Sequence, residues 1–383
     1  MPSEGFLYLG TGDGRMVRIE ANTGQLDEGW KYPPGKTGLG AIYGSPLVKD
    51  GVVYDAGYSC RGNVCAAEVF ALDAATGTPV WSEGGYKVAS KVVGRAAFGA
   101  GVLVFGTAQV GQEDDTPGYL YALDPAQDAG KQLQDRVQGR LKWRVAVDGV
   151  VFSGPAVADG VAYFGTMGRT LYAVDLKDDA RYRDNPSARI LWKFKTDGAI
   201  TSSPLVHDGK VFFGDFQDRF YALNVEARRQ GNQGAVTGAN GEWTFNSEGW
   251  FWAQPVAEGG VVYAATLSGR VYALDEKTGQ QKWTEPVVIK GLVVAAPGFV
   301  DSQRGRALAV PSGEKDVVIV RLDDGSIQGS LFTNGPVMSS PSVVGDFVFV
   351  HAKNGEFYTF SSKSFERRSC VITRGKEAGG RCA

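Results

Sequence analysis

One repeated phrase along the chain limits what it can fold into. A run of β-branched and aromatic residues leads into Gly-Thr or a related turn, followed by Tyr-Ala-Leu-Asp, Thr-Gly and a Trp. The clearest copy runs from Val261 to Trp283, and another includes Ala71–Trp81. We count eight copies, of which the last two are degenerate. A repeat of roughly 40 to 60 residues predicts one supersecondary unit per copy, stacked against its neighbours.

A second periodic element precedes most copies: a Gly followed six positions later by a Pro. The pairs are Gly40/Pro46, Gly149/Pro155, Gly198/Pro204, Gly249/Pro255, Gly291/Pro297 and Gly335/Pro341. Each unit then divides into four short strands: A begins near the Pro, B precedes Gly-Thr, C is Tyr-Ala-Leu-Asp, and D carries the Trp. Short strands bounded by Gly, Asp and Asn turns are typical of all-β folds.

Four antiparallel strands repeated eight times predict an eight-bladed β-propeller. The first copy lacks an inner strand in sequence, so the C-terminal tail supplies that strand, or the native chain extends upstream. Seven closed blades with a remnant are the alternative. We expect residues 1–368 to form the propeller and residues 369–383 to form a tail with a disulfide.

Composition excludes several classes of protein. Lys and Arg total 40 against 42 Asp and Glu, a net charge of −2 that gives no field for holding nucleic acid. No apolar run approaches the length of a membrane span. The chain has two histidines, His207 and His351, which argues against a multi-histidine metal site. We therefore expect neither nucleic-acid binding nor a transmembrane segment.

The pattern Ala-x-Asp-x-x-Thr-Gly-x-x-x-Trp fits Ala71–Trp81 and Ala273–Trp283 at every fixed position. It resembles the tryptophan-docking repeat of the pyrroloquinoline-quinone (PQQ) β-propeller superfamily, and the chain is closest in style to its BamB-like, non-catalytic members. The resemblance implies that one Trp per unit packs between blades. These structural tryptophans are Trp30, Trp81, Trp143, Trp192, Trp243 and Trp283.

That superfamily includes quinoprotein alcohol dehydrogenases, cofactor-free scaffolds and sensor ectodomains, and fold does not decide among them. In the dehydrogenases the resemblance implies a Trp floor, a disulfide between adjacent cysteines, Ca²⁺ held by Glu and Asn, and an Asp base. This sequence has no adjacent cysteine pair. We therefore expect no catalytic residues, no metal and no cofactor, with PQQ and Ca²⁺ at an atypical site as the alternative.

An aromatic run interrupts the D-to-A connection after the fifth unit: Trp250, Phe251 and Trp252. In a propeller the D-to-A and B-to-C loops share one face around the mouth of the channel. We expect a candidate binding face there, formed by Trp250, Phe251, Trp252, Phe152, Tyr43 and Met338. It contacts a partner or a planar ligand, or the rings plug the channel and pack between blades.

The four cysteines fall into two short-range pairs, Cys60 with Cys65 and Cys370 with Cys382. Local disulfides fit an oxidising compartment and therefore a periplasmic or extracellular protein. Free thiols and a zinc site are the alternatives. Zinc is disfavoured because tight Cys-x-x-Cys turns are missing.

Three consecutive C-to-D connections are long and carry arginines. The candidate docking loops contain Arg136, Arg140, Arg181, Arg183, Arg228 and Arg229. They form a docking patch for an acidic partner or membrane surface, or ordinary solvated loops with interleaved acidic residues. The sequence as a whole predicts a non-catalytic binding scaffold of the bacterial cell envelope, as a monomer or a subunit of a larger assembly that binds envelope or surface proteins. A PQQ-dependent oxidoreductase and a ligand-sensing ectodomain are the alternatives.

Overall fold

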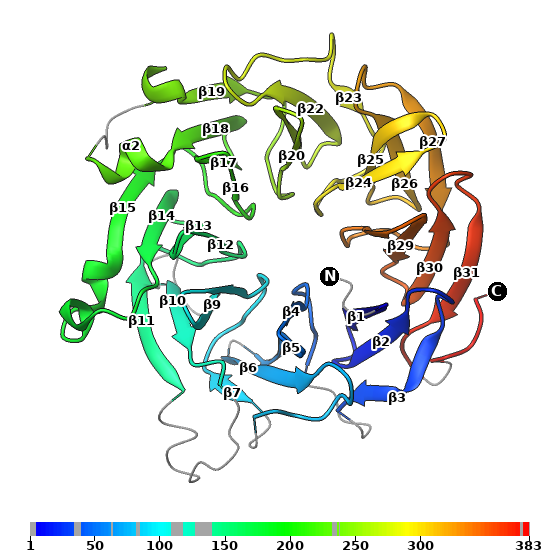
Figure 1. Ribbon diagram of the computed structural model, residues 1–383, viewed down its shortest axis with the longest axis horizontal. Helices are drawn as coiled ribbons and strands as arrows, with labels where there is room; N and C mark the ends of the chain where they lie inside the picture. Colours follow the sequence, from blue (N-terminus) through cyan, green and yellow to red (C-terminus); the bar gives the residue numbers. More distant parts are fainter. Residues whose placement is uncertain are drawn as a thin grey trace. The chain divides into compact units, whose positions relative to one another are not determined.

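The fold is given by a computed structural model, which describes residues 5–33, 40–62, 64–81, 85–108, 118–126, 140–231, 236, 238–375 and 378–382. Eight antiparallel sheets follow one another along the chain (Figure 1). The chain divides into two compact units, whose main bodies are Asp27–Val206 and His207–Ala383. The turn region Ile19–Leu26 groups with the second unit.

Four sheets begin in the first unit, the first with three strands and the others with four. They are β1 (Phe6–Gly10), β2 (Met16–Glu20) and β3 (Leu26–Tyr32); β4 (Leu47–Lys49), β5 (Val52–Arg61), β6 (Val64–Asp73) and β7 (Tyr86–Val88); β8 (Ala97–Gly99), β9 (Val102–Gly106), β10 (Gly118–Leu123) and β11 (Leu141–Val147); β12 (Ala156–Ala158), β13 (Val161–Gly165), β14 (Thr170–Asp175) and β15 (Ile190–Lys195).

Four more sheets, each of four strands, follow from the start of the second unit. They are β16 (Leu205–His207), β17 (Lys210–Gly214), β18 (Arg219–Asn224) and β19 (Trp243–Asn246); β20 (Val256–Glu258), β21 (Val261–Ala265), β22 (Arg270–Asp275) and β23 (Val287–Val288); β24 (Gly298–Ser302), β25 (Gly305–Pro311), β26 (Asp316–Arg321) and β27 (Ile327–Phe332); β28 (Ser342–Val344), β29 (Phe347–His351), β30 (Glu356–Ser361) and β31 (Arg367–Ile372).

Short helices interrupt two of the long connections between third and fourth strands. They are η1 (Ala180–Tyr182) and η2 (Pro186–Arg189) before β15, and α2 (Val225–Arg229) and η3 (Ala239–Gly241) before β19. The side chain of Asn224 begins α2 by accepting the backbone N–H groups of Glu226 and Ala227 at 3.1 and 2.9 Å, as an N-cap does.

Burial explains why the inner strands are nearly all apolar while the outer strands alternate. Every residue of β13 and β14 is buried, whereas β15 alternates buried and exposed residues along Trp192–Lys195. An inner strand with both faces covered by neighbouring sheets needs a continuous apolar run. An outer strand with one face in water needs a period of two.

The tryptophan of each repeat packs against the next sheet. Trp243 Nε1 donates to the carbonyl oxygen of Glu276 at 3.0 Å, and a Cβ added at Gly279 would come within 2.6 Å of the Trp243 ring. Trp283 likewise donates to the carbonyl oxygen of Leu322 at 2.8 Å. The Gly of each Thr-Gly therefore leaves room for the preceding indole. All six of these tryptophans are 8% exposed or less: Trp30, Trp81, Trp143, Trp192, Trp243 and Trp283.

The predicted eight-bladed β-propeller is confirmed, and the seven-bladed alternative is wrong, because the first copy of the repeat forms a sheet of its own. The C-terminal tail does not supply a strand to that sheet within the described residues. Instead β31 pairs with β30, and Arg381 pairs with Val371. Strand β31 also crosses the boundary that we expected between residues 368 and 369.

Both predicted disulfides are present. Cys60 and Cys65 face each other across β5 and β6, where their bond closes the end of a long hairpin. Cys370 in β31 is bonded to Cys382, which ties the tail to the last sheet. Within the part of the chain described, no helix has both the length and the apolar character needed to cross a membrane.

Candidate binding surface

The connection between β19 and β20 presents two indole side chains to solvent. Trp250 is 50% exposed and Trp252 is 38% exposed, while Phe251 between them is 2% exposed. Successive side chains of an extended backbone point to opposite sides, which explains this alternation. Trp250 and Trp252 are therefore exceptions among the tryptophans, since those of the repeat are buried.

Phe251 anchors the connection from below. A Cβ added at Gly214, the last residue of β17, would lie 2.2 Å from Cγ of Phe251, so only glycine leaves room for this ring. The Phe251 ring also contacts that of Phe220 with centroids 5.2 Å apart. We expected Phe251 on the binding face. Its burial gives it a structural role instead.

A third ring joins the two indoles. Phe216 stacks on Trp250 with centroids 5.2 Å apart and an interplanar angle of 16°, and it contacts Trp252 at 5.8 Å and 33°. We call Phe216, Trp250 and Trp252 the aromatic cluster. The sequence analysis missed Phe216, although its position directly after Gly214-Asp215, in the B-to-C turn, was a usable signal.

Asp215 shapes the turn that carries Phe216. Its carboxylate accepts the backbone N–H groups of Gln217 and Arg219 at 2.8 and 3.1 Å and the hydroxyl of Tyr221 at 3.0 Å. Burial, and then the charge of Asp215, raise the pKa of Tyr221, so its hydroxyl stays protonated and donates. Asp218 completes the turn with a φ of 59°.

The backbone on the Trp250 side is held by two neighbouring turns. Ser247 Oγ donates to the carbonyl oxygen of Asp218 at 3.0 Å. The Trp250 carbonyl oxygen accepts the N–H of Leu267 at 2.6 Å, and the N–H of Glu248 donates to the hydroxyl of Tyr272 at 2.9 Å. The aromatic cluster therefore stands on a backbone fixed from both sides, as a preorganised binding surface requires.

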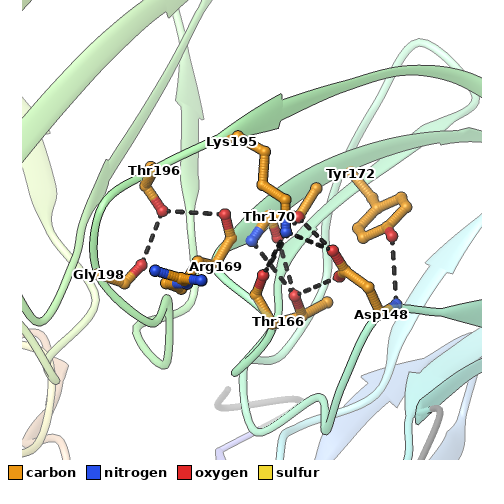
Figure 2. A network of polar contacts seen from close by, with 9 residues as sticks. Asp148, Thr166, Arg169, Thr170, Tyr172, Lys195, Thr196 and Gly198 are labelled. Carbon is orange, nitrogen blue, oxygen red and sulfur yellow. Dashed lines mark hydrogen bonds and ion pairs between the residues drawn. The ribbon is translucent and has the colours of Figure 1, made fainter. Parts of the chain in front are cut away.

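The corresponding place in the first unit is polar. Asp148, just before Gly149, accepts hydrogen bonds from Thr166 at 2.9 Å, Thr170 at 2.6 Å and Lys195 at 2.9 Å (Figure 2). Burial alone raises the pKa of Asp148, but the bonds from Thr170, Lys195 and Thr166 hold it below its ordinary value. The Asp148 N–H donates to the hydroxyl of Tyr172 at 3.2 Å. These partners are internal, so the network fixes the loop.

The other expected members of the binding face lie apart from the aromatic cluster in the chain. Tyr43 and Phe152 belong to the first unit, where Tyr43 is 64% exposed and lies 5.7 Å from the ring of Tyr58. Phe152 is partly buried. Met338, in the second unit, is 39% exposed. Of the six expected residues, the aromatic cluster contains Trp250 and Trp252.

Two of the expected docking arginines are buried and have internal partners. The Arg140 guanidinium lies 4.1 Å from the Trp81 ring centroid and donates to the carbonyl oxygen of Asp124 at 2.8 Å. Arg228 forms a two-pronged ion pair with Glu242 at 2.8 and 2.7 Å. These side chains stabilise the insertions. They are not presented to a partner.

The remaining docking arginines face solvent among acidic residues. Arg181 pairs with Asp179 at 2.8 Å, and Arg229 lies 3.9 Å from Glu226. Arg183 is exposed, and Arg136 lies outside the described residues. Exposed pairs of this kind contribute little energy. The loops therefore have interleaved charges at the described positions.

The donor set of a quinoprotein dehydrogenase does not fit this chain. Its two disulfides join cysteines five and twelve positions apart, so neither is the adjacent pair of that site. Among the described residues, Glu356, Cys370 and Cys382 bring three potential metal-ligand atoms together, but the two sulfurs are bonded to each other. We derive no reaction step through a cofactor or a metal.

Comparison with solved structures supports the fold at low sequence identity. BamB from Moraxella catarrhalis matches with a TM-score of 0.65 and 17% identity, covering 94% of this chain and 91% of that one. The computationally designed Ika8 protein matches with a TM-score of 0.65 and 15% identity, covering 94% of each. Quinohemoprotein alcohol dehydrogenase from Comamonas testosteroni matches with a TM-score of 0.62 and 14% identity, covering 99% of this chain and 74% of the enzyme.

Sequence comparison is more specific. No curated protein sequence matches the chain. The family model described as "Outer membrane protein assembly factor BamB" matches residues 1–136 and 135–368. These two matches cover nearly the whole chain and each spans several copies of the repeat. The protein therefore belongs to the family of the outer membrane protein assembly factor BamB.

Proposed function

We propose that this protein is a non-catalytic scaffold of the bacterial cell envelope that holds a protein partner through the aromatic cluster. The observation that carries the proposal is the half-exposed Trp250 and Trp252 on a backbone anchored by neighbouring turns. The family match supports a scaffold, because the matched family is named for an assembly factor.

The chemistry of the aromatic cluster suits protein recognition. Tryptophan supplies a large apolar area with few rotatable bonds, and it is enriched among the residues that dominate interface energetics. Stacking on Phe216 restricts both indoles before any partner arrives. Less side-chain entropy is then lost on binding, which favours affinity.

The disulfides support the proposed location. Local disulfides such as Cys60–Cys65 and Cys370–Cys382 persist in oxidising compartments and are rare where thiols are kept reduced. A periplasmic or extracellular site of action fits both bonds.

The test compares proteins captured from envelope extracts by immobilised wild type, by the double variant Trp250→Ala/Trp252→Ala, and by Leu292→Ala. Leu292 occupies the position of Trp250 in the connection after Gly291 and is 49% exposed, so it controls for loss of any exposed apolar side chain there. We expect wild type and the control to capture the same proteins, and the double variant to lose them. Undiminished capture by a folded double variant would overturn the proposal.

A further inference from the structure

Arg95 is unusual for its place in the fold. It stands in the connection between β7 and β8, directly before Ala96, at the position that Ser45 and Ser203 occupy before the Pro of their own connections. Its side chain is partly buried. A long cation therefore replaces a small hydroxyl residue at this position.

The stem of Arg95 lies across the neighbouring connection. A Cβ added at Gly154 would lie 2.5 Å from Cγ of Arg95, so glycine at 154 is what allows the side chain to extend there. The N–H of Gly154 donates to Oγ of Ser203 at 2.8 Å. On the other side, a Cβ added at Gly94 would lie 2.7 Å from the Ser153 carbonyl oxygen. Three consecutive connections thus lie side by side around this arginine.

Arg95 differs from the other buried arginines because it has no partner among the residues that the structure describes. Arg140 donates to two carbonyl oxygens and Arg189 does the same. Arg228 is paired with Glu242. Burying a charge without a partner is costly, and burial lowers the pKa of the Arg95 guanidinium. The unpaired state of Arg95 therefore requires an explanation.

The buried carboxyl nearby does not provide a counter-charge. A Cβ added at Gly44 would lie 2.9 Å from Oδ1 of Asp55 and 3.8 Å from Cα of Arg95, so the two residues flank the same glycine. Burial raises the pKa of Asp55 well above its ordinary value, which keeps the carboxyl neutral. Its one described hydrogen bond comes from the N–H of Ala56 at 2.8 Å.

We propose that Arg95 is an anion-binding site for a small molecule that carries a carboxylate or phosphate group, seated over Gly154 beside Ser203. The planar guanidinium offers paired N–H donors that match two oxygens of such a group. Its partial exposure gives the anion access, and its burial strengthens the interaction. This site is independent of the aromatic cluster.

The test measures thermal unfolding of the full chain in chloride, inorganic phosphate and acetate at matched ionic strength, for wild type, Arg95→Gln and Arg183→Gln. Arg183 is an exposed arginine of the same unit and serves as the control. Phosphate stabilises many proteins without binding a site, so the difference between variants is the readout. Comparing phosphate with acetate distinguishes the two anion classes.

We expect wild type and Arg183→Gln to show a saturable rise of at least about 2 °C in one of the two anions. Arg95→Gln should lose that rise and melt higher than wild type in chloride, because it no longer buries an unpaired charge. If Arg95→Gln melts lower in chloride and keeps the anion-dependent rise, Arg95 is a structural residue and the proposal is overturned. Equal anion effects in all three proteins would also overturn it.

Discussion

The connections 149–155 and 249–255 begin and end with the same Gly and Pro, yet they differ in what they show to solvent. In both, the third residue is buried over a glycine: Val151 over Gly106 and Phe251 over Gly214, each with a contact of 2.2 Å to an added Cβ. Around the first connection, polar side chains satisfy one another (Figure 2). Around the second, aromatic rings face water.

This difference separates what the fold requires from what it leaves open. The inward residue must fill the space over a glycine, so its size is set by packing. The outward residues have no such constraint from the blade. Two half-exposed indoles at such positions are not needed for folding, which is why we assign them to binding.

The largest expected effect is on the inward position. Phe251→Ala removes a buried ring and leaves a cavity, and we expect a loss of about 3–5 kcal/mol in the free energy of unfolding. Val151→Ala is the matched change in the other connection and should cost less, since fewer atoms are removed. Denaturant unfolding of both variants checks this. Equal small losses at both positions would contradict the anchoring role of Phe251.

The polar network of the first connection should matter for stability and depend on pH. Asp148→Asn weakens the bonds from Thr166, Thr170 and Lys195, with an expected cost of about 1–3 kcal/mol at neutral pH. Because the folded pKa of Asp148 lies below its ordinary value of 3.8, its contribution is present above that value and is lost as pH falls through the folded pKa. Unfolding curves of both proteins should therefore converge at low pH, and a gap that widens on acidification would refute the account.

The outward aromatic residues should matter little for stability. Trp250→Ala/Trp252→Ala should change the free energy of unfolding by less than about 1 kcal/mol, the range expected for surface positions. The same denaturant experiment measures it. A loss as large as that of Phe251→Ala would mean that the indoles belong to the core.

The smallest expected effect is that of the cofactor. Titration with PQQ and Ca²⁺, followed by tryptophan fluorescence, should give no saturable quenching, because the adjacent-cysteine motif is missing. Saturable quenching at low PQQ concentration would instead support an oxidoreductase with an atypical site, and dye-linked alcohol oxidation would then be measured.

Much of the fold could be predicted because the repeat states it several times. The spacing of Thr-Gly and Trp predicted the sheets, and the positions of Cys60 and Cys65 predicted a local bond that the structure contains. Trp250 and Trp252 were found as an aromatic run. Phe216 and the inward position of Phe251 were missed, because both depend on the contact between two turns separated along the chain.

The arginine-rich insertions show the same limit. Their charge could be read from the sequence, but the partners could not. Arg140 covers Trp81 and Arg228 pairs with Glu242, contacts that only the folded insertion creates. Composition therefore suggested a docking patch where two of the arginines stabilise the fold.

The most direct test of the central claim is site-specific photo-crosslinking in cells of the producing organism. p-Benzoylphenylalanine replaces Trp250 in one protein and Leu292 in the other, two positions with exposed fractions of 50% and 49%. The account predicts a discrete crosslinked protein partner from position 250 and none from position 292. No crosslink from position 250, or the same crosslinks from both positions, would contradict it.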